Sequence, residues 1–338
     1  MIDFLIGLLD TPSPTGDTER AMAYVRQRWE HLPVRMEMTA KGALVATWEG
    51  EQADAPRALT AHVDTLGAMV QQIKPSGRLQ LVRIGGLSWT SVEGDGCTVF
   101  ASSGQAYRGS HLPNAVSGHA HLPEVRDAKR DFDTMEVRLD ARTTSQAETE
   151  ALGIRVGDFV DFDPRVEVGE AGFIRSRFLD DKASVAAIYG ALAALAEAGL
   201  RPRQRTTIFI SNYEEVGHGA AGGFPPDLAE LVAVDMAVVA PGQQSDEFSV
   251  TICAKDAGGP YHLGLRRKLE ALAESNQLRY HTDVYLYYAS DATAYWAAGG
   301  AARIGLIGPG VDASHHYERT HREALENTAK LIAAYLLS

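Results

Sequence analysis

The sequence predicts an α/β protein in which helices cover a mixed sheet and a small all-β domain is inserted. In most of the chain, short apolar runs typical of buried strands alternate with helical patterns rich in alanine. From about residue 67 to residue 165 the chain is instead rich in glycine, with short alternating segments and no long helical period. The length of 338 residues and the 45% of hydrophobic residues are ordinary for a globular protein and suffice for a full core.

The α/β part shows helical and strand patterns with recognisable limits. A long alanine-rich helix begins near residue 183 and should stop at Gly199 and Pro202, because glycine and proline end helices. The other patterns predict helices at about residues 1–10 and 15–29, and strands at 57–62, 206–210 and 236–240.

The glycine-rich segment is expected to form an inserted domain. Its alternating runs include Arg78–Arg83 and Met135–Leu139, and turn residues separate them. Both ends of the segment return to the α/β pattern. We therefore expect one domain made of residues 1–66 and 166–338, interrupted by a second domain of residues 67–165.

Charge and cysteine content narrow the function classes. With 32 Lys and Arg against 44 Asp and Glu, the formal charge is −12, which disfavours nucleic acids and anionic membranes as partners. Cys97 and Cys253 are too few for a disulfide framework. The apolar start lacks a basic region, and no apolar run approaches the roughly 18 residues of a spanning helix. We expect a soluble, cytoplasmic protein.

Two candidate functional segments carry a histidine or adjacent aspartates. His62 and Asp64 follow a predicted strand and are two residues apart, so their side chains should face the same side. A metal-binding histidine often donates its second ring N–H to such a carboxylate; an ordinary strand end is the alternative. Asp180 and Asp181 precede the alanine-rich helix, where one Asp could simply cap the helix. A carboxylate between two cations would use the same position.

Three further segments add carboxylates and imidazoles. Glu214 and Glu215 directly follow a predicted strand, where open α/β sheets bind ligands, although a surface loop explains them equally well. Asp235 heads an apolar run, where a lone carboxylate is costly unless it is paired or metal-bound. The last segment, Asp312–His321, contains three histidines and could also be only a polar loop.

Taken in order, these residues provide five metal ligands and one free carboxylate. Two metal ions that share one bridging carboxylate require this inventory. Carboxylates and imidazoles without thiolates favour Zn²⁺, Co²⁺ or Mn²⁺ over a structural cysteine site.

The ordered motifs resemble a known family, the dinuclear metallo-aminopeptidases that include the tetrahedral, glutamyl and deblocking aminopeptidases; some relatives were once called endoglucanases. The resemblance covers most of the chain, through Pro12–Gly16, His62–Gly67, Arg155–Val160, Leu179–Lys182, Glu214–Gly217 and Leu325–Thr328. It implies a zinc-exopeptidase-like core, and an inserted dimerisation domain between His62 and Asp180. Members of the family form homo-oligomers, from dimers to shells of twelve subunits.

The resemblance also implies a role for each candidate residue. Asp180 would bridge two divalent cations, zinc or cobalt, and Glu214 would be the general base. Asp64 would orient His62. The implied metal ligands are His62, Asp180, Glu215, Asp235 and His315. The implied reaction is hydrolysis of an N-terminal peptide bond or a small amide bond by a water that bridges the cations.

The chain departs from the family pattern in places. The family usually has Arg-Tyr-x-His-Ser where this chain has Ser314–Glu318, so His316 and His321 remain rivals of His315. Lys182 and His218 also replace the usual residues. These departures resemble a branch associated with bacterial synthesis of an acetylated glutaminylglutamine amide, an osmolyte. A small glutamine-containing amide is therefore an alternative to a general peptide substrate.

Other interpretations of the same sequence predict different properties. Asp291, in a segment that resembles a substrate-pocket stretch, is expected either to hold the free amine of the substrate or to cap a helix. The same metals could instead serve deacylation of N-acyl amino acids. A non-catalytic scaffold with the same fold would bind fewer than two metal ions and hydrolyse no amide.

Overall fold

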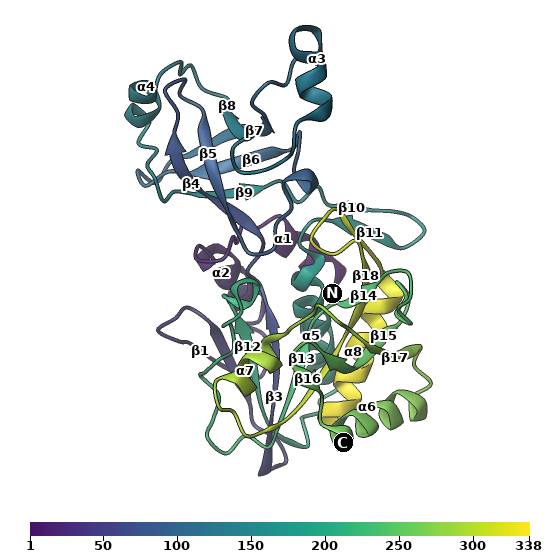
Figure 1. Cartoon of the computed structure of the whole chain (residues 1–338). Helices are drawn as coiled ribbons and strands as arrows, with labels where there is room; N and C mark the ends of the chain where they lie inside the picture. The colour runs from purple at the N-terminus through teal and green to yellow at the C-terminus, as the bar shows by residue number, and fades with distance from the viewer. The chain divides into compact units, whose positions relative to one another are not determined.

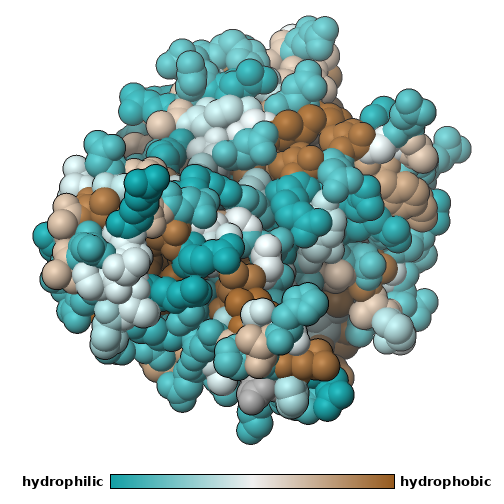
Figure 2. Space-filling model, turned by 90° about the horizontal axis from the view of Figure 1, so that it is seen from above, coloured by the Kyte–Doolittle hydropathy of each residue, from teal (hydrophilic) through white to brown (hydrophobic). Residues whose placement is uncertain are grey.

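The computed structural model describes residues 1–338, apart from the side chain of Glu124. The chain divides into two compact units, Met1–Thr65 with Arg165–Ser338, and Leu66–Pro164. These limits lie within one residue of those expected from the sequence. In the described residues, no helix combines the length and the apolar character needed to cross a membrane. The face seen in Figure 2 is mainly hydrophilic, with scattered apolar patches, as is usual when most apolar side chains lie in a core.

The larger unit is built on a mixed sheet of 13 strands. The order of its main path is β1-β2-β12-β3-β13-β18-β19-β11-β10, with β14 beside β18 and with β15 pairing β16, β17 and β18. The strands are β1 (Arg35–Met38), β2 (Leu44–Trp48), β3 (Gln52–His62), β10 (Glu167–Val168), β11 (Phe173–Ser176), β12 (Gln204–Ser211), β13 (Glu230–Val234), β14 (Ala237–Val239), β15 (Val250–Asp256), β16 (Gly259–Pro260), β17 (Tyr280–Val284), β18 (Arg303–Asp312) and β19 (Glu318–His321).

Four central strands run parallel and end at one edge of this sheet. β3 pairs in parallel with both β12 and β13, and β13 pairs in parallel with β18. All five residues of β13 are buried, as expected for a strand covered on both faces. In the register, Ser211 at the end of β12 lies opposite His62 at the end of β3. Residues that directly follow these strands therefore gather at the same edge.

Six helices and one helical turn belong to this unit (Figure 1). They are α1 (Ile2–Leu9), α2 (Glu19–Arg28), α5 (Leu179–Glu197), α6 (Leu263–Ser275), α7 (Asp291–Ala297), α8 (Arg322–Leu337) and the 3₁₀ turn η2 (Glu214–Val216). α8 begins at the N-cap His321, whose ring accepts the Glu323 N–H. Its buried residues recur every three or four positions, so one face of the helix lies against the protein. These buried residues are Ala324, Leu325, Thr328, Leu331, Ile332, Tyr335 and Leu336.

The smaller unit is a closed barrel of six strands in the order β4-β5-β8-β7-β6-β9. Every pairing in it is antiparallel, and closure removes the free edges that an open sheet would expose. Its elements are β4 (Gly67–Ile73), β5 (Leu79–Ile84), η1 (Trp89–Ser91), β6 (Gly96–Phe100), β7 (Ala106–Pro113), α3 (Gly118–Asp127), β8 (Met135–Leu139), α4 (Gln146–Ala151) and β9 (Phe159–Phe162).

The structure confirms the predicted fold class and corrects some of its details. The mixed sheet, its helices and the inserted β domain are present. The predicted strand at 57–62 is the C-terminal part of β3, the one at 206–210 lies within β12, and the one at 236–240 contains the shorter β14. The expectation of an all-β insertion missed α3 and α4. α3 contains Pro123 and a non-helical residue, His121, which break the helical period in the sequence.

Gly308 lets strand β18 approach the segment that follows β13. A Cβ atom on Gly308 would lie 1.8 Å from the Asp235 carbonyl oxygen, and the Asp235 N–H donates to the Ile307 carbonyl at 2.9 Å. Because backbone cannot rotate away as a side chain can, only glycine fits here without displacing Asp235.

Gly308→Ala should therefore lower the free energy of unfolding by about 1–3 kcal/mol, the usual cost of overpacking, as measured by urea denaturation. Gly305→Ala on the same strand is the matched control. Its Cβ would meet only side-chain atoms of Leu265 and Leu269 at 3.3 Å, which can move. Equal effects of the two substitutions would show that the contact with Asp235 is unimportant.

Candidate metal centre

Five separate elements deliver acidic or imidazole side chains to the carboxyl edge of the parallel strands. His62 is the last residue of β3, and Asp235 directly follows β13. Glu215 lies in η2, just after β12, and Asp180 lies at the start of α5. His315 comes from the loop between β18 and β19. Residues far apart in the sequence thus meet because their strands end together.

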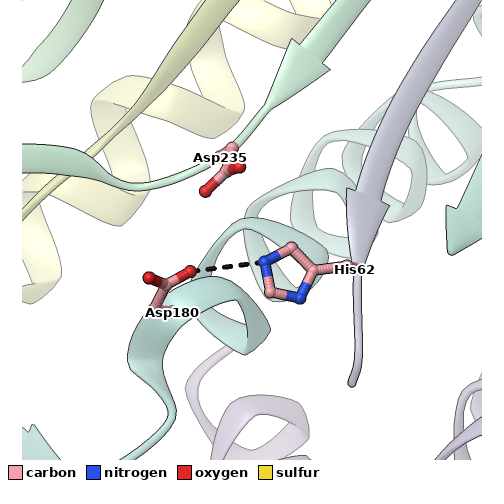
Figure 3. A group of neighbouring side chains, drawn as sticks. All are labelled: His62, Asp180 and Asp235. Carbon is pink, nitrogen blue, oxygen red and sulfur yellow. Dashed lines mark ion pairs between the residues drawn. The ribbon is translucent and has the colours of Figure 1, made fainter. Parts of the chain in front are cut away.

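The side chains form two groups with Asp180 in common. One consists of His62, Asp180 and Asp235 (Figure 3), and the other of Asp180, Glu215 and His315. Within each group the ligand atoms lie within 4.8 Å of one another. Asp180 Oδ1 is 3.3 Å from His62 Nε2, and Asp180 Oδ2 is 3.5 Å from His315 Nε2. One carboxylate therefore faces an imidazole with each of its oxygens.

Two atoms of these groups that could bind a metal ion are buried and form no hydrogen bond within the described residues. His62 Nε2 is one: its 3.3 Å approach to Asp180 lacks hydrogen-bond geometry. Asp235 Oδ1 is another. A buried polar atom without a partner is energetically unfavourable. A bound cation would give both atoms a partner. Oxygen and imidazole nitrogen donors are those that zinc, cobalt and manganese accept.

The centre holds more negative charge than its imidazoles can balance. Burial raises the pKa of Glu214 and Glu215 well above the usual range, and raises the pKa of Asp235 to about 8. The hydrogen bond with Asp180, opposed by burial, raises the pKa of His315 to about 10. These shifts show that the carboxylates lack counter-charges, which divalent cations would supply.

Asp64 supports the centre through hydrogen bonds to His62, Glu214 and Glu215. The His62 Nδ1–H donates to the Asp64 main-chain carbonyl at 2.9 Å, while the Asp64 carboxylate lies 3.5 Å away. That carboxylate accepts the N–H groups of Glu214 and Glu215 at 3.1 and 3.2 Å and the Thr15 hydroxyl at 2.7 Å. Asp64 therefore fixes the His62 ring mainly through its carbonyl, and its carboxylate fixes the Glu214–Glu215 segment.

Comparison with known proteins agrees with this geometry. The family model described as M42 glutamyl aminopeptidase matches residues 42–331. The chain belongs to the M42 glutamyl aminopeptidase family. The aminopeptidase homologue YhfE of Bacillus subtilis is 45% identical over 331 residues, which are 98% of this chain and 95% of YhfE. Family members are metal-dependent aminopeptidases, which makes this chain a peptide hydrolase by family.

Solved structures share the fold. The TET1 peptidase of Pyrococcus horikoshii, which can assemble into a tetrahedron or a large octahedral shell, matches with a TM-score of 0.86 and 22% identity over 100% of this chain and 99% of that one. An aminopeptidase of the archaeon Desulfurococcus kamchatkensis matches with a TM-score of 0.88 and 22% identity over 99% and 94% of the two chains. At this identity the likeness shows the fold.

The three late histidines of this M42 chain occupy different places. His315 alone of them has its ring nitrogen close to Asp180 and Glu215, at 3.5 and 3.7 Å. The His316 ring is exposed, and its Nδ1 lies 3.4 Å from the Ser314 carbonyl. His321 caps α8, and its Nε2 donates to the Ala171 carbonyl at 2.8 Å. In this structure His315 is thus the histidine placed to join the second group.

Asp291 is buried and does not belong to the lining of the cavity beside the centre. It is 3% exposed, and its carboxylate accepts the Ala220 N–H at 2.8 Å and the Thr60 hydroxyl at 3.1 Å. The N-cap of α7 is its neighbour Ser290. Asp291 therefore braces the backbone beyond the Glu214–Glu215 segment, a role that neither sequence interpretation anticipated.

Two further carboxylates, to which the sequence analysis assigned no role, support the centre. Glu318 is 2% exposed, and its two oxygens accept the N–H groups of Asp180 and His315 at 3.1 and 2.9 Å. Asp181, fully buried, accepts the His62 N–H at 3.3 Å. Glu318 follows His315 by only three residues, but no pattern in the sequence shows that it turns inward.

Glu318→Gln should weaken metal binding about 10- to 100-fold, the usual effect of changing a group that supports a ligand. The amide that replaces one oxygen would face an N–H and repel it. Chelator competition with Zn²⁺ or Co²⁺ measures this affinity. Glu323→Gln, an exposed change in the first turn of α8, is the control. Unchanged affinity in Glu318→Gln would mean that Glu318 does not position Asp180 and His315.

Proposed function

We propose that this chain removes N-terminal residues from peptides or cleaves small amides with a free amine, using two divalent cations, zinc or cobalt. Asp180 carries the proposal, because its two oxygens face the two imidazoles and it belongs to both ligand groups. We assign His62 and Asp235 to one cation and Glu215 and His315 to the other, with Asp180 between them. When bound, the cations would lower the pKa of a water molecule and polarise the scissile carbonyl.

Glu214 is our candidate for the general base. It lies next to Glu215 but belongs to neither ligand group among the described residues. Its carboxylate lines the same cavity as Asp180 and Asp235, and its Oε2 lies 3.7 Å from His62 Nε2. The Asp64 carboxylate holds the Glu214 N–H, so the side chain starts from a fixed backbone position. Glu214 can therefore take a proton from water and pass it to the leaving amine.

We also propose that the chain forms a homo-oligomer through its barrel unit, residues 66–164. The support is the self-assembly of the P. horikoshii TET1 peptidase into closed shells, together with the fold that the two chains share. The proposed assembly ranges from a dimer to a shell of twelve subunits. We also propose a cytoplasmic location.

The substrate type is tested with a pair of chromogenic amides, one with a free amine and the other its N-acetyl counterpart. The metal-loaded protein should hydrolyse the free-amine compound at least about 100-fold faster in kcat/KM, a difference of about 2.7 kcal/mol in transition-state binding. The metal-free protein is the control. Cleavage of only the acetylated compound would replace the aminopeptidase proposal with a deacylase.

Glu214→Gln tests the general base. The variant should keep two equivalents of zinc or cobalt by elemental analysis and lose about 10²- to 10⁴-fold in kcat, because the amide cannot accept the proton. Glu323→Gln, on the exposed start of α8, is again a suitable control. Near-normal activity with full metal content would remove Glu214 from the mechanism.

A further inference from the structure

A cavity of about 580 Å³ opens beside the proposed metal centre, and its far wall is uncharged. Its lining includes Asp180, Glu214, Glu215 and Asp235 at the centre. The rest of the lining comes from β14 with its flanks, from the loop after β17, and from Gly217, Ser314 and His315. The first two segments contribute Met236, Val238, Gln243, Tyr285, Leu286, Tyr287, Tyr288 and Ala289. A substrate whose scissile bond lies at the centre would place its first side chain against this wall.

Two of the three tyrosines of the wall, Tyr285 and Tyr288, have their hydroxyl groups occupied within the protein, whereas Tyr287 is 98% exposed. The Tyr285 hydroxyl lies 2.9 Å from Ser245 Oγ, and Ser245 in turn donates to Asp283 at 2.9 Å. The Tyr288 hydroxyl donates to the Met236 carbonyl at 2.9 Å. Both residues therefore present aromatic rings to the cavity, and rings attract apolar and aromatic groups.

Gln243 adds an uncharged amide group to this wall. In the orientation that satisfies its surroundings, its amide nitrogen donates to Asp283 Oδ1 at 3.0 Å and to the Val284 carbonyl at 3.1 Å. The amide nitrogen is thus held away from a ligand, which leaves the amide oxygen as the group able to bind one. An oxygen accepts hydrogen bonds from hydroxyl or amide groups and repels carboxylates.

A negatively charged side chain would find no cationic partner on the wall away from the centre, and the one imidazole of the lining, His315, is assigned to a metal ion. Of the described residues that line it, none is a lysine or an arginine. The carboxylates of Asp180, Glu214, Glu215 and Asp235 match the four positive charges of two divalent cations, so no positive charge is left over. A buried, unpaired carboxylate is strongly disfavoured.

We propose that this enzyme selects substrates with an uncharged, preferably large, first side chain and rejects glutamate, in contrast to the glutamyl aminopeptidase activity after which the family is named. This inference rests on the proposed aminopeptidase function. The wall built by β14 and the 285–289 loop determines the preference through its rings, the Gln243 oxygen and its lack of cations.

Glutamine and glutamate have the same size and differ in charge, so their p-nitroanilides separate charge from shape. The metal-loaded enzyme should show kcat/KM for the glutamine compound about 10- to 100-fold above that for the glutamate compound, because the carboxylate lacks a partner. The phenylalanine compound should exceed the alanine compound about 10-fold. Equal rates for glutamine and glutamate, or alanine above phenylalanine, would overturn the inference.

Leu286→Lys adds a cation at the cavity wall. Leu286 is 67% exposed, so the change should not affect folding. The lysine should narrow the gap between glutamine and glutamate about 2- to 5-fold, the range of an exposed ion pair. Leu286→Met, which is uncharged and of similar length, should keep the wild-type ratio. If Leu286→Lys leaves the glutamine-to-glutamate ratio of kcat/KM unchanged, the first side chain of the substrate does not lie against this wall.

A binding measurement separates the test of this selectivity from the test of the proposed function. If the metal-loaded protein hydrolyses none of the four compounds, the aminopeptidase proposal fails. Calorimetry with glutamine amide and with glutamic acid α-amide then decides the inference on its own. Tighter binding of the glutamine compound supports the uncharged cavity, and equal or weaker binding overturns it.

Discussion

The chemistry proposed for this protein depends on one buried carboxylate, Asp180, that faces two imidazoles. Asp180 can occupy that position only because other groups offset its negative charge. His62 and His315 approach its two oxygens, and these two imidazoles hold its pKa below the usual range even though burial acts in the opposite direction. Around it the structure gathers further carboxylates, whose pKa values are raised by burial and by the neighbouring negative charges. Such a cluster is unfavourable by itself, and a pair of cations is its natural complement.

The fold brings the residues of this cluster together. Parallel strands end at a common edge, so β3, β12 and β13 bring their following residues together without any local signal between them. The backbone of this edge is then fixed by carboxylates that are not themselves in the ligand groups. Asp64 holds the N–H groups of Glu214 and Glu215, and Glu318 holds those of Asp180 and His315. Ligand positions thus follow from main-chain hydrogen bonds as much as from side-chain choice.

The same edge of the sheet contributes both to the proposed substrate cavity and to the proposed metal centre. The segment after β13 contributes Asp235 to the centre and, two residues later, begins β14, which forms part of the cavity wall. A single stretch of chain therefore sets both a candidate ligand and the surface that a substrate's first side chain would meet. Close packing of β18 at Gly308 leaves this stretch little freedom to move.

The sequence alone was sufficient for the fold class, because periodicity and composition are local properties of the chain. It also identified the segments that meet at the centre, since residues at the ends of parallel strands must converge. It missed the short helices of the barrel unit: the helical period of α3 is broken, and α4 has only 6 residues.

Only the tertiary structure decided which late histidine approaches Asp180. His315, His316 and His321 are chemically equivalent in the sequence, and the path of one loop separates them. It also decided that Glu318 turns inward to bind two N–H groups. The contacts of His315 and Glu318 with Asp180 join segments more than a hundred residues apart, and no pattern within a single segment encodes them.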